Sequence, residues 1–222
     1  LEVIRIASDK TIDTSTIINQ TPISGAIFMD LSKFHWLYPP TRFELDADKL
    51  TLFTDPDTDF WQRTYYGFQH DNAPAFLTTV SETEFSFTVT AKWTPVKLFD
   101  QCGVVLYQDA DNWFKASVEY EFPQSSKLGS VVTNLGYSDW ATTDISSAQN
   151  EMTYRLSRRG QDFCIENAFD GISFKQMRIF HMHQRLESVN IGVYACSPLE
   201  SSMQAEFSGF TFGPYQWPLH NA

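Results

Sequence analysis

The residues best suited to chemistry lie in one expected strand, from Asn112 to Glu121. Successive side chains of a strand point to opposite faces, so every second residue shares a face. One face of this strand therefore carries Trp113, Lys115, Ser117, Glu119 and Glu121. An aromatic ring beside a cation and carboxylates suits sugar recognition, because the ring stacks on a pyranose and the charged groups bind its hydroxyls. The same pattern also fits a solvated sheet face with a cross-strand ion pair.

A second expected strand, Phe60 to Gly67, is rich in both aromatic and polar residues. Alternation puts Trp61, Arg63 and Tyr65 on one of its faces. This composition is typical of a strand that lines a cleft, and ordinary cross-strand aromatic pairing explains it equally well. The residues of other strands and loops that could join the same face are Gln101, Asn134, Asp139, Trp140, Arg155 and Arg178.

Glycoside hydrolysis needs paired carboxyl groups, and Glu119 and Glu121 are the glutamates that share a plausible strand face. Residues at i and i+2 of a strand lie about 7 Å apart, within the range that separates the two carboxyl groups of glycosidases. Acidic pairs are frequent on strand faces, however, and the Glu-x-Asp-x-x-Glu pattern of sandwich glucanases is absent from the sequence. Glu119 and Glu121 are therefore weak candidates, and no catalytic residue is assigned.

Metal and cofactor sites lack complete signatures. His181 and His183 could bind a metal from one side of a strand, but no third ligand accompanies them, so we expect two partly exposed loop histidines. Asp55, Asp57 and Asp59 lack the full ligand loop of an EF-hand. The sequence also contains no glycine-rich phosphate loop and no G-x-S-x-G nucleophile elbow. We therefore predict no metal and no cofactor.

The net charge and the cysteine content indicate which kinds of partner and which cellular location to expect. The 222 residues carry a net charge of -11, which opposes binding to nucleic acids and to anionic membranes. No run approaches the roughly 20 apolar residues that span a bilayer. Cys102, Cys164 and Cys196 cannot all pair with one another and are expected as buried thiols, which favours a reducing, cytoplasmic location. The oligomeric state stays open, because exposed edge strands allow a dimer without requiring one.

Short alternating runs separated by turn residues recur along the whole chain, and helical periodicity is almost absent. Phe85, Phe87 and Val89, for example, share one face of an expected strand. Polar turns such as Asp109–Asn112 and Arg159–Asp162 suit hairpins between antiparallel neighbours. The sequence therefore predicts one all-β domain over residues 1–222, a two-sheet antiparallel sandwich. The further expected strands are 85–90, 102–107, 128–134, 152–158, 161–166, 174–180, 189–195 and 204–212.

Six segments of the chain form a recognisable set of motifs, namely Thr58–Phe68, Phe99–Val104, Asp111–Lys115, Tyr137–Trp140, Leu156–Gly160 and Ala195–Pro198. Together they resemble a large uncharacterised family, whose fungal members are described as regulation of enolase proteins. The likeness covers roughly residues 25–213, which we take as the core of the domain. It implies a concanavalin A-like jelly roll, similar to the accessory domains of β-xylosidases, without an established catalytic mechanism.

The resemblance also implies a site on the concave face of one sheet. The positions that match the family there, and that we expect to bind ligand, are Trp61, Arg63, Tyr65, Gln101, Trp113, Lys115, Glu119, Asp139 and Trp140. This set agrees in part with the alternation of the two strands described above. The segment Asp71–Phe76 departs from the family, whose members often carry a histidine before the aromatic residue. A polar group of the family site is therefore missing here.

These observations favour a non-catalytic binding domain for a carbohydrate or another small polar ligand. Two alternatives come from other functional classes. One is a cytoplasmic regulator that binds a metabolic enzyme such as enolase, which the description of the fungal members suggests. The other is a glycoside hydrolase, which requires two carboxyl groups across a cleft.

Overall fold

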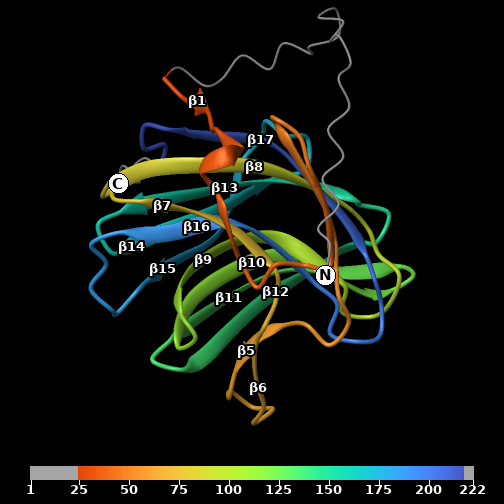
Figure 1. The fold of residues 1–222 in the computed structure, drawn as a ribbon. Helices are drawn as coiled ribbons and strands as arrows, with labels where there is room; N and C mark the ends of the chain where they lie inside the picture. Colours follow the sequence, from red (N-terminus) through yellow and green to blue (C-terminus); the bar gives the residue numbers. More distant parts are fainter. Residues whose placement is uncertain (1–24, 218–222) are drawn as a thin grey trace, which may run out of the picture.

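The computed structural model describes residues 25–217, which form two large antiparallel β-sheets packed face to face (Figure 1). The predicted all-β, two-sheet antiparallel sandwich is therefore confirmed. The prediction of a single domain over residues 1–222 extends beyond the described residues and stays a prediction. No helix in the described part of the chain is long and apolar enough to cross a membrane.

Within residues 25–217 the strands follow one another along the chain, and a single short 3-10 helix, Leu31–Lys33, comes after the first of them. Their bounds are β1 Ile27–Phe28, β2 His35–Leu37, β3 Arg42–Leu45, β4 Lys49–Phe53, β5 Phe60–Gln62, β6 Gln69–Asp71, β7 Ala75–Val80, β8 Glu84–Thr94, β9 Gln101–Asp109, β10 Asn112–Phe122, β11 Ser125–Asn134, β12 Tyr137–Ser146, β13 Glu151–Arg159, β14 Asp162–Ala168, β15 Lys175–His181, β16 Val189–Cys196 and β17 Gln204–Gly213.

Each large sheet combines strands that are distant in the sequence. The eight-stranded sheet has the order β15-β14-β13-β8-β17-β4-β3, with β1 paired to β17. The seven-stranded sheet has the order β12-β11-β10-β9-β16-β7-β2. Strands β5 and β6 form a separate hairpin, which projects from one end of the sandwich (Figure 1). The candidate site lies on the seven-stranded sheet and beside this hairpin.

Alternating apolar residues hold the two large sheets together. In β8, Phe85, Phe87 and Val89 are fully buried and face the other sheet, as their spacing predicts. Phe114 and Val118 of β10 are also fully buried and join the same core from the seven-stranded sheet. Each such side chain stabilises the fold by about 1.5–3 kcal/mol when fully buried. The opposite face of β10 is therefore free to carry polar residues.

A second apolar cluster lies on the opposite face of the seven-stranded sheet, which we call the outer face. The ring of Phe60 in β5 lies 5.6 Å from that of Trp113 in β10 and 6.0 Å from that of Tyr194 in β16. All three side chains are fully buried. The β5–β6 hairpin thus folds over part of the outer face and leaves the rest of it open.

The expected strand from Phe60 to Gly67 is wrong beyond Gln62, where β5 ends. Arg63 and Tyr65 have φ values of +58° and +61°, in the left-handed region that strands do not use. The chain therefore turns here, and the alternation expected for Trp61, Arg63 and Tyr65 does not hold.

Other strands had no matching prediction, namely β1, β2, β3, β4, β6, β7 and β12. Most of them are short, and β12 is a largely exposed edge strand with little apolar alternation. The expected strands in the rest of the chain match the observed ones to within a few residues. Cys102, Cys164 and Cys196 are buried free thiols, as expected.

Candidate functional site

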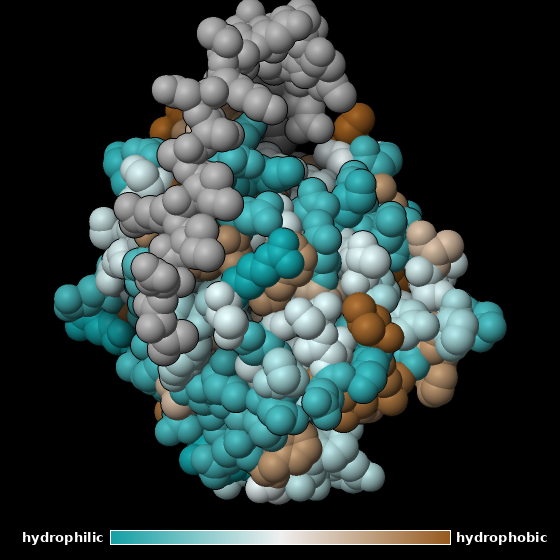
Figure 2. Space-filling view, turned by 45° about the vertical axis from the view of Figure 1, so that its right-hand side comes forward, coloured by the Kyte–Doolittle hydropathy of each residue, from teal (hydrophilic) through white to brown (hydrophobic). Residues whose placement is uncertain are grey.

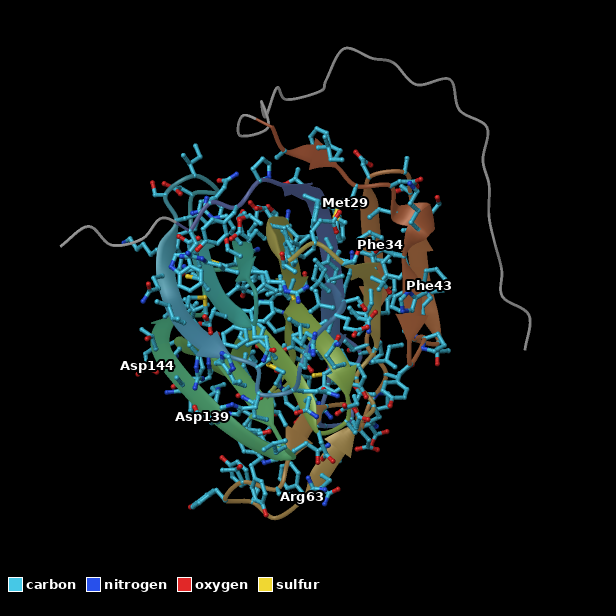
Figure 3. All side chains as sticks on the ribbon, turned by 90° about the vertical axis from the view of Figure 1, so that its left-hand side faces the viewer. Met29, Phe34, Phe43, Arg63, Asp139 and Asp144 are labelled. Atoms are coloured by element: carbon cyan, nitrogen blue, oxygen red, sulfur yellow. The ribbon has the colours of Figure 1, made fainter. Side chains whose placement is uncertain are left out.

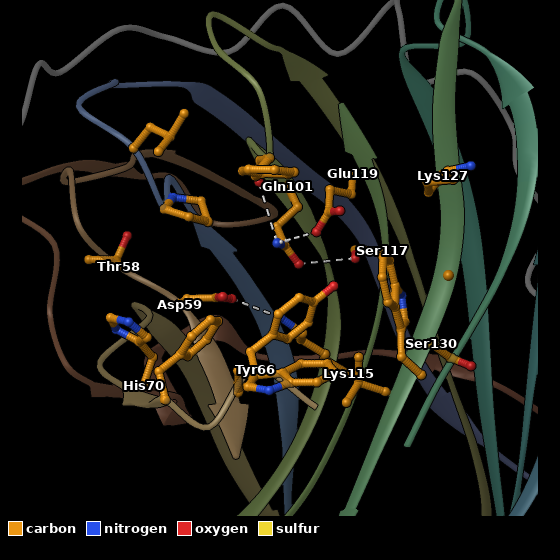
Figure 4. Close-up of a pocket in the computed structure, with 18 of the residues that line it drawn as sticks. Thr58, Asp59, Tyr66, His70, Gln101, Lys115, Ser117, Glu119, Lys127 and Ser130 are labelled. Carbon is orange, nitrogen blue, oxygen red and sulfur yellow. Dashed lines mark hydrogen bonds and ion pairs between the residues drawn. The ribbon is translucent and has the colours of Figure 1, made fainter. Parts of the chain in front are cut away.

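A pocket of about 340 Å³ opens on the outer face of the seven-stranded sheet, and we call it the outer-face pocket. Strands β9, β10 and β11 form its floor, and the β5–β6 hairpin and β12 form its walls (Figure 4). The polar side chains of the floor belong to Gln101, Lys115, Ser117, Glu119 and Lys127. Ser130 also lines the pocket, but it pairs with Ala116, so its side chain is on the face of β11 that points to the other sheet. The aromatic residues of the wall and rim are Trp61, Tyr66, Phe68, Phe99 and Trp140.

An ion pair between Lys115 and Asp59 closes one side of the floor (Figure 4). Lys115 Nζ lies 2.9 Å from Asp59 Oδ1, and the two side chains are only 5% and 16% exposed. Burial alone would lower the pKa of Lys115, but the charge and hydrogen bond of Asp59, together with Cys196 and Glu119 nearby, outweigh this effect and hold the pKa above its usual value. Asp59 Oδ1 also accepts the backbone N–H of Phe60 at 2.7 Å, so the pair joins β10 to the start of the hairpin.

A hydrogen-bond network fixes the carboxyl group of Glu119 (Figure 4). Gln101 Nε2 donates to Glu119 Oε2 at 2.8 Å and to the Phe99 carbonyl at 3.4 Å. Gln101 Oε1 in turn accepts the hydroxyl groups of Tyr194, at 2.9 Å, and Ser117, at 3.4 Å. Since the Phe99 carbonyl and an ionised Glu119 only accept hydrogen bonds, the NH₂ group of Gln101 must face them.

The environment of Glu119 changes its acidity. Burial raises the pKa of Glu119 to about 7, Lys115 opposes this shift, and the nearby carboxylates of Asp59 and Glu121 add to it. Near neutral pH the group therefore exists both as a charged acceptor and as a neutral donor. Such a carboxyl group suits either ligand binding or proton transfer.

Glu121, the carboxyl group that would have to act together with Glu119 in glycoside hydrolysis, is not in the pocket. Glu121 Oε2 lies 3.6 Å from Lys127 Nζ, to which it is ion-paired. Asp59, the carboxylate nearest the floor from the hairpin side, is held by Lys115. The arrangement therefore supports binding better than a pair of catalytic carboxyl groups.

Aromatic rings form a continuous wall along the pocket. The ring of Trp61 lies 6.4 Å from that of Trp140 and 5.4 Å from that of Tyr66, which stacks on Phe68 at 5.4 Å. Gly129 of β11 leaves room for the indole ring of Trp140 to lie against the sheet, because a Cβ atom at that position would lie only 3.0 Å from Trp140 Nε1. Rings arranged in this way can pack against the C–H face of a sugar.

Arg63 holds the hairpin in position and lies outside the pocket. Arg63 Nη1 donates to Asp111 Oδ1 at 2.9 Å and to the Gly136 carbonyl at 2.8 Å. Asp111 lies in the turn between β9 and β10, and Gly136 lies in the turn between β11 and β12. Arg63 thus fastens the aromatic wall to the end of the sheet, where Figure 3 shows it on the projecting hairpin.

The outer-face pocket brings together five of the nine residues expected to bind ligand, namely Trp61, Gln101, Lys115, Glu119 and Trp140. Besides Arg63, three of the nine lie elsewhere. Tyr65 is 93% exposed at the tip of the hairpin, and Trp113 is fully buried beneath Phe60. Asp139, labelled in Figure 3, precedes Trp140 in β12 and so points to the opposite face. There it forms an ion pair with Arg178.

Many residues of the pocket were not predicted to bind ligand from the sequence, among them Asp59, Tyr66, Phe68 and His70. These four belong to the aromatic-rich segment around β5 and β6. The density of aromatic residues marks this segment in the sequence. Which of them face the pocket depends on the turn after Gln62, which alternation does not reveal.

The two histidines considered as metal ligands do not line the pocket. His181 ends β15, and its Nδ1 lies 2.6 Å from Asp162 Oδ1. His183 lies in the following loop, with its ring 5.4 Å from that of His181, and both side chains are exposed. Within residues 25–217 no group of three or more His, Cys, Asp or Glu side chains is placed to hold a metal ion.

Comparison with known sequences confirms the resemblance inferred from the motifs. The model of a family described as "Protein of unknown function (DUF1349)" matches residues 36–215. The chain is 29% identical over 193 residues to a protein of Saccharomyces cerevisiae named "Regulation of enolase protein 1", which covers 86% of this chain and 96% of that protein.

Comparison with solved structures confirms the concanavalin A-like jelly roll. A functionally unknown protein from Saccharomyces cerevisiae superposes with a TM-score of 0.79 and 26% identity over 85% of this chain and 100% of that one. The GH43 BlXynB protein from Bacillus licheniformis has a TM-score of 0.61 and 15% identity over 84% of this chain but 39% of its own. An alginate lyase from Klebsiella pneumoniae has a TM-score of 0.58 and 9% identity over 84% of this chain and 97% of its own. The last two likenesses concern the fold alone.

Proposed function

The chain belongs to the DUF1349 family of proteins of unknown function, and we propose that it is a non-catalytic binding domain whose outer-face pocket holds a carbohydrate or another small polar ligand. One observation carries the proposal. The pocket sets a continuous aromatic wall against a floor of charged and hydroxyl groups. A sugar has both complementary surfaces, an apolar C–H face and a rim of hydroxyl groups.

Hydrogen-bonding groups are available to such a ligand on the floor. Among the contacts of residues 25–217, Glu119 Oε1 and Asp59 Oδ2 have no hydrogen-bond partner, although the other oxygen of each carboxyl group is used. The hydroxyl group of Ser117 lies on the same floor. A ligand with several hydroxyl groups can therefore donate to the carboxylates while its ring packs on the wall.

Binding without catalysis is supported by the state of the carboxyl groups. Glu121 lies outside the pocket and is ion-paired with Lys127, so the Glu119 and Glu121 pair does not flank a ligand. A glycoside hydrolase needs a second carboxyl group on the other side of the scissile bond. We therefore expect no turnover of oligosaccharides.

The proposal is tested by calorimetric titration and thermal shift with a panel of neutral mono- and oligosaccharides. Specific binding stabilises the native state by mass action. Trp140→Ala removes part of the wall at a side chain that is 39% exposed, so the variant should still fold. Tyr137→Ala is the matched control, because Tyr137 lies on β12 but on the opposite face and is 64% exposed.

Binding by the wild type and Tyr137→Ala, with a loss of about tenfold or more in Trp140→Ala, supports the proposal. A folded wild type that binds none of the panel contradicts it. Equal binding by the wild type and Trp140→Ala contradicts the assignment to this pocket.

A second candidate is a cytoplasmic regulator that binds a metabolic enzyme such as enolase, favoured by the name of the 29% identical relative. A partner surface of this kind usually contains exposed apolar side chains. Several occur here, among them Ile27, Phe28, Phe122 and Ile172. Figure 2 shows hydrophobic residues in small separate groups on the face in view. Sedimentation of the chain with purified enolase tests this candidate, since a complex must sediment faster than either protein alone.

A further inference from the structure

The charged groups on the lining of the outer-face pocket are three carboxyl and two ammonium groups, from Asp57, Asp59, Glu119, Lys115 and Lys127. Both ammonium groups already have carboxylate partners. Lys115 pairs with Asp59, and Lys127 pairs with Glu121 and Asp144. Within the described part of the chain, the lining therefore offers two carboxyl groups without a cationic partner, Glu119 and Asp57, and no lysine or arginine without a partner. Asp57 is exposed, whereas Glu119 is partly buried.

The strongest neutral donor on the floor is also occupied. Gln101 uses its NH₂ group for Glu119 Oε2 and the Phe99 carbonyl. It cannot turn that group toward a ligand, because the amide oxygen would then face the Phe99 carbonyl and the ionised Glu119, which only accept hydrogen bonds. The hydroxyl groups of Tyr194 and Ser117 lie at its oxygen on the other side. Tyr194 is fully buried, so this restraint belongs to the sheet itself.

The consequence is a floor that accepts hydrogen bonds more readily than it donates them. Glu119 Oε1, which has no partner among the described residues, is an acceptor when the group is ionised. A ligand hydroxyl that donates to it forms a charge-assisted hydrogen bond, which is stronger than a neutral one. A carboxylate or phosphate on the ligand would instead meet a like charge in a partly buried site, where salt screens poorly.

We propose that the outer-face pocket selects neutral sugars over sugar acids and sugar phosphates, and that Glu119 is the residue that sets this selectivity. The inference rests on the proposed carbohydrate-binding function. It adds a ligand class and a specificity-determining residue to that function. The net charge of -11 acts in the same direction at long range, but it is shared by the whole surface.

The test compares neutral sugars with anionic counterparts of the same ring by calorimetric titration. Glucose is compared with glucuronate and with glucose 6-phosphate, and galactose is compared with galacturonate. Titrations are run at pH 8, where Glu119 is ionised because its pKa is about 7. The proteins are the wild type, Glu119→Gln and a control, Glu44→Gln, which removes one charge from the exposed strand β3 of the other sheet.

The proposal predicts that wild type and Glu44→Gln bind a neutral sugar about tenfold or more tightly than its anionic counterpart. In Glu119→Gln the preference should fall to about threefold or less, mainly through tighter binding of the anion. Equal binding of neutral and anionic sugars by the wild type overturns this inference and leaves the proposed function standing. A preference that persists in Glu119→Gln overturns the role of Glu119. Binding of no sugar by the folded wild type overturns both the inference and the proposed function.

Discussion

Lys115 Nζ lies 2.9 Å from Asp59 Oδ1, and this ion pair joins the floor strand β10 to the segment that leads into the β5–β6 hairpin. The two residues are 56 positions apart in the chain. Both side chains are largely buried, so the pair is shielded from solvent in a way that surface ion pairs are not. This ion pair therefore links the floor of the pocket to the hairpin that forms its wall.

Lys115→Met should lower the free energy of unfolding by about 3 kcal/mol, because it leaves Asp59 as an uncompensated, largely buried charge. Adding Asp59→Asn to Lys115→Met removes that charge and should recover part of the loss. Urea unfolding of both variants and the wild type measures the difference. A double variant that is less stable than Lys115→Met would show that the charge of Asp59 is not the cause.

Gly136→Ala should make the β5–β6 hairpin, which carries part of the aromatic wall, more mobile, although Gly136 does not line the pocket. A Cβ atom at Gly136 would lie 2.2 Å from Arg63 Nη1, so Arg63 would be displaced from its partners. We expect a loss of about 1 kcal/mol in stability beyond the backbone effect. Hydrogen exchange of the amides in residues 60–71 should become faster.

Gly160→Ala is the matched control for this change. Gly160 also has a positive φ, of +64°, but nothing lies within 4 Å of its Cβ position. It should therefore show the backbone cost of alanine alone. Equal exchange in residues 60–71 of the two variants would contradict the role of Arg63 as the anchor of the hairpin.

Glu119→Gln should become more stable relative to the wild type as the pH rises. The pKa of Glu119 is about 7 in the folded protein and its usual value is 4.5, so between these values the folded state holds a proton that the unfolded state has lost. Wild-type stability therefore falls as pH increases through this window, and the full cost is present above it. Glutamine does not titrate and avoids this cost.

The expected difference between Glu119→Gln and the wild type grows by about 1 to 3 kcal/mol from pH 5 to pH 8, since one pKa unit corresponds to about 1.4 kcal/mol. Urea unfolding at pH 5, 6, 7 and 8 measures it. A difference that stays constant over this range would show that Glu119 titrates at its ordinary pKa.

Alternation along β10 was enough to predict the polar floor of the pocket. Lys115, Ser117 and Glu119 share the outer face because the strand pairs without a register shift from Trp113 to Glu119 and its other face is apolar. The same reasoning placed Trp113 on the outer face, where it does lie. It could not show that Phe60 covers Trp113, because that contact depends on how the hairpin folds over the sheet.

The walls of the pocket were harder to predict for two physical reasons. The left-handed turn at Arg63 and Tyr65 ends the alternation that the sequence suggests, and nothing in those residue types requires a turn. Asp139 and Trp140 are adjacent in one strand, so both cannot face the pocket, although both belong to one recognised motif. Motif membership identified the region, and the backbone geometry determined which side chains face the pocket.

The buried state of Trp113 also changes how the site should be probed. Trp113→Ala should cost about 3–5 kcal/mol of stability, because it removes a fully buried ring from beneath Phe60. Thermal unfolding measures this loss. Near wild-type stability would contradict the packing described for the hairpin, and any loss of ligand binding in this variant is explained by the loss of folding.

The most direct test of the binding site is an NMR titration that follows the indole N–H signals of the six tryptophans while neutral sugars are added. The account predicts that a bound sugar shifts the signals of Trp61 and Trp140, which line the pocket, and leaves that of Trp93, which is buried in the core between the large sheets, unchanged. Binding that shifts neither Trp61 nor Trp140, or a folded protein whose indole signals respond to none of the sugars, would contradict it.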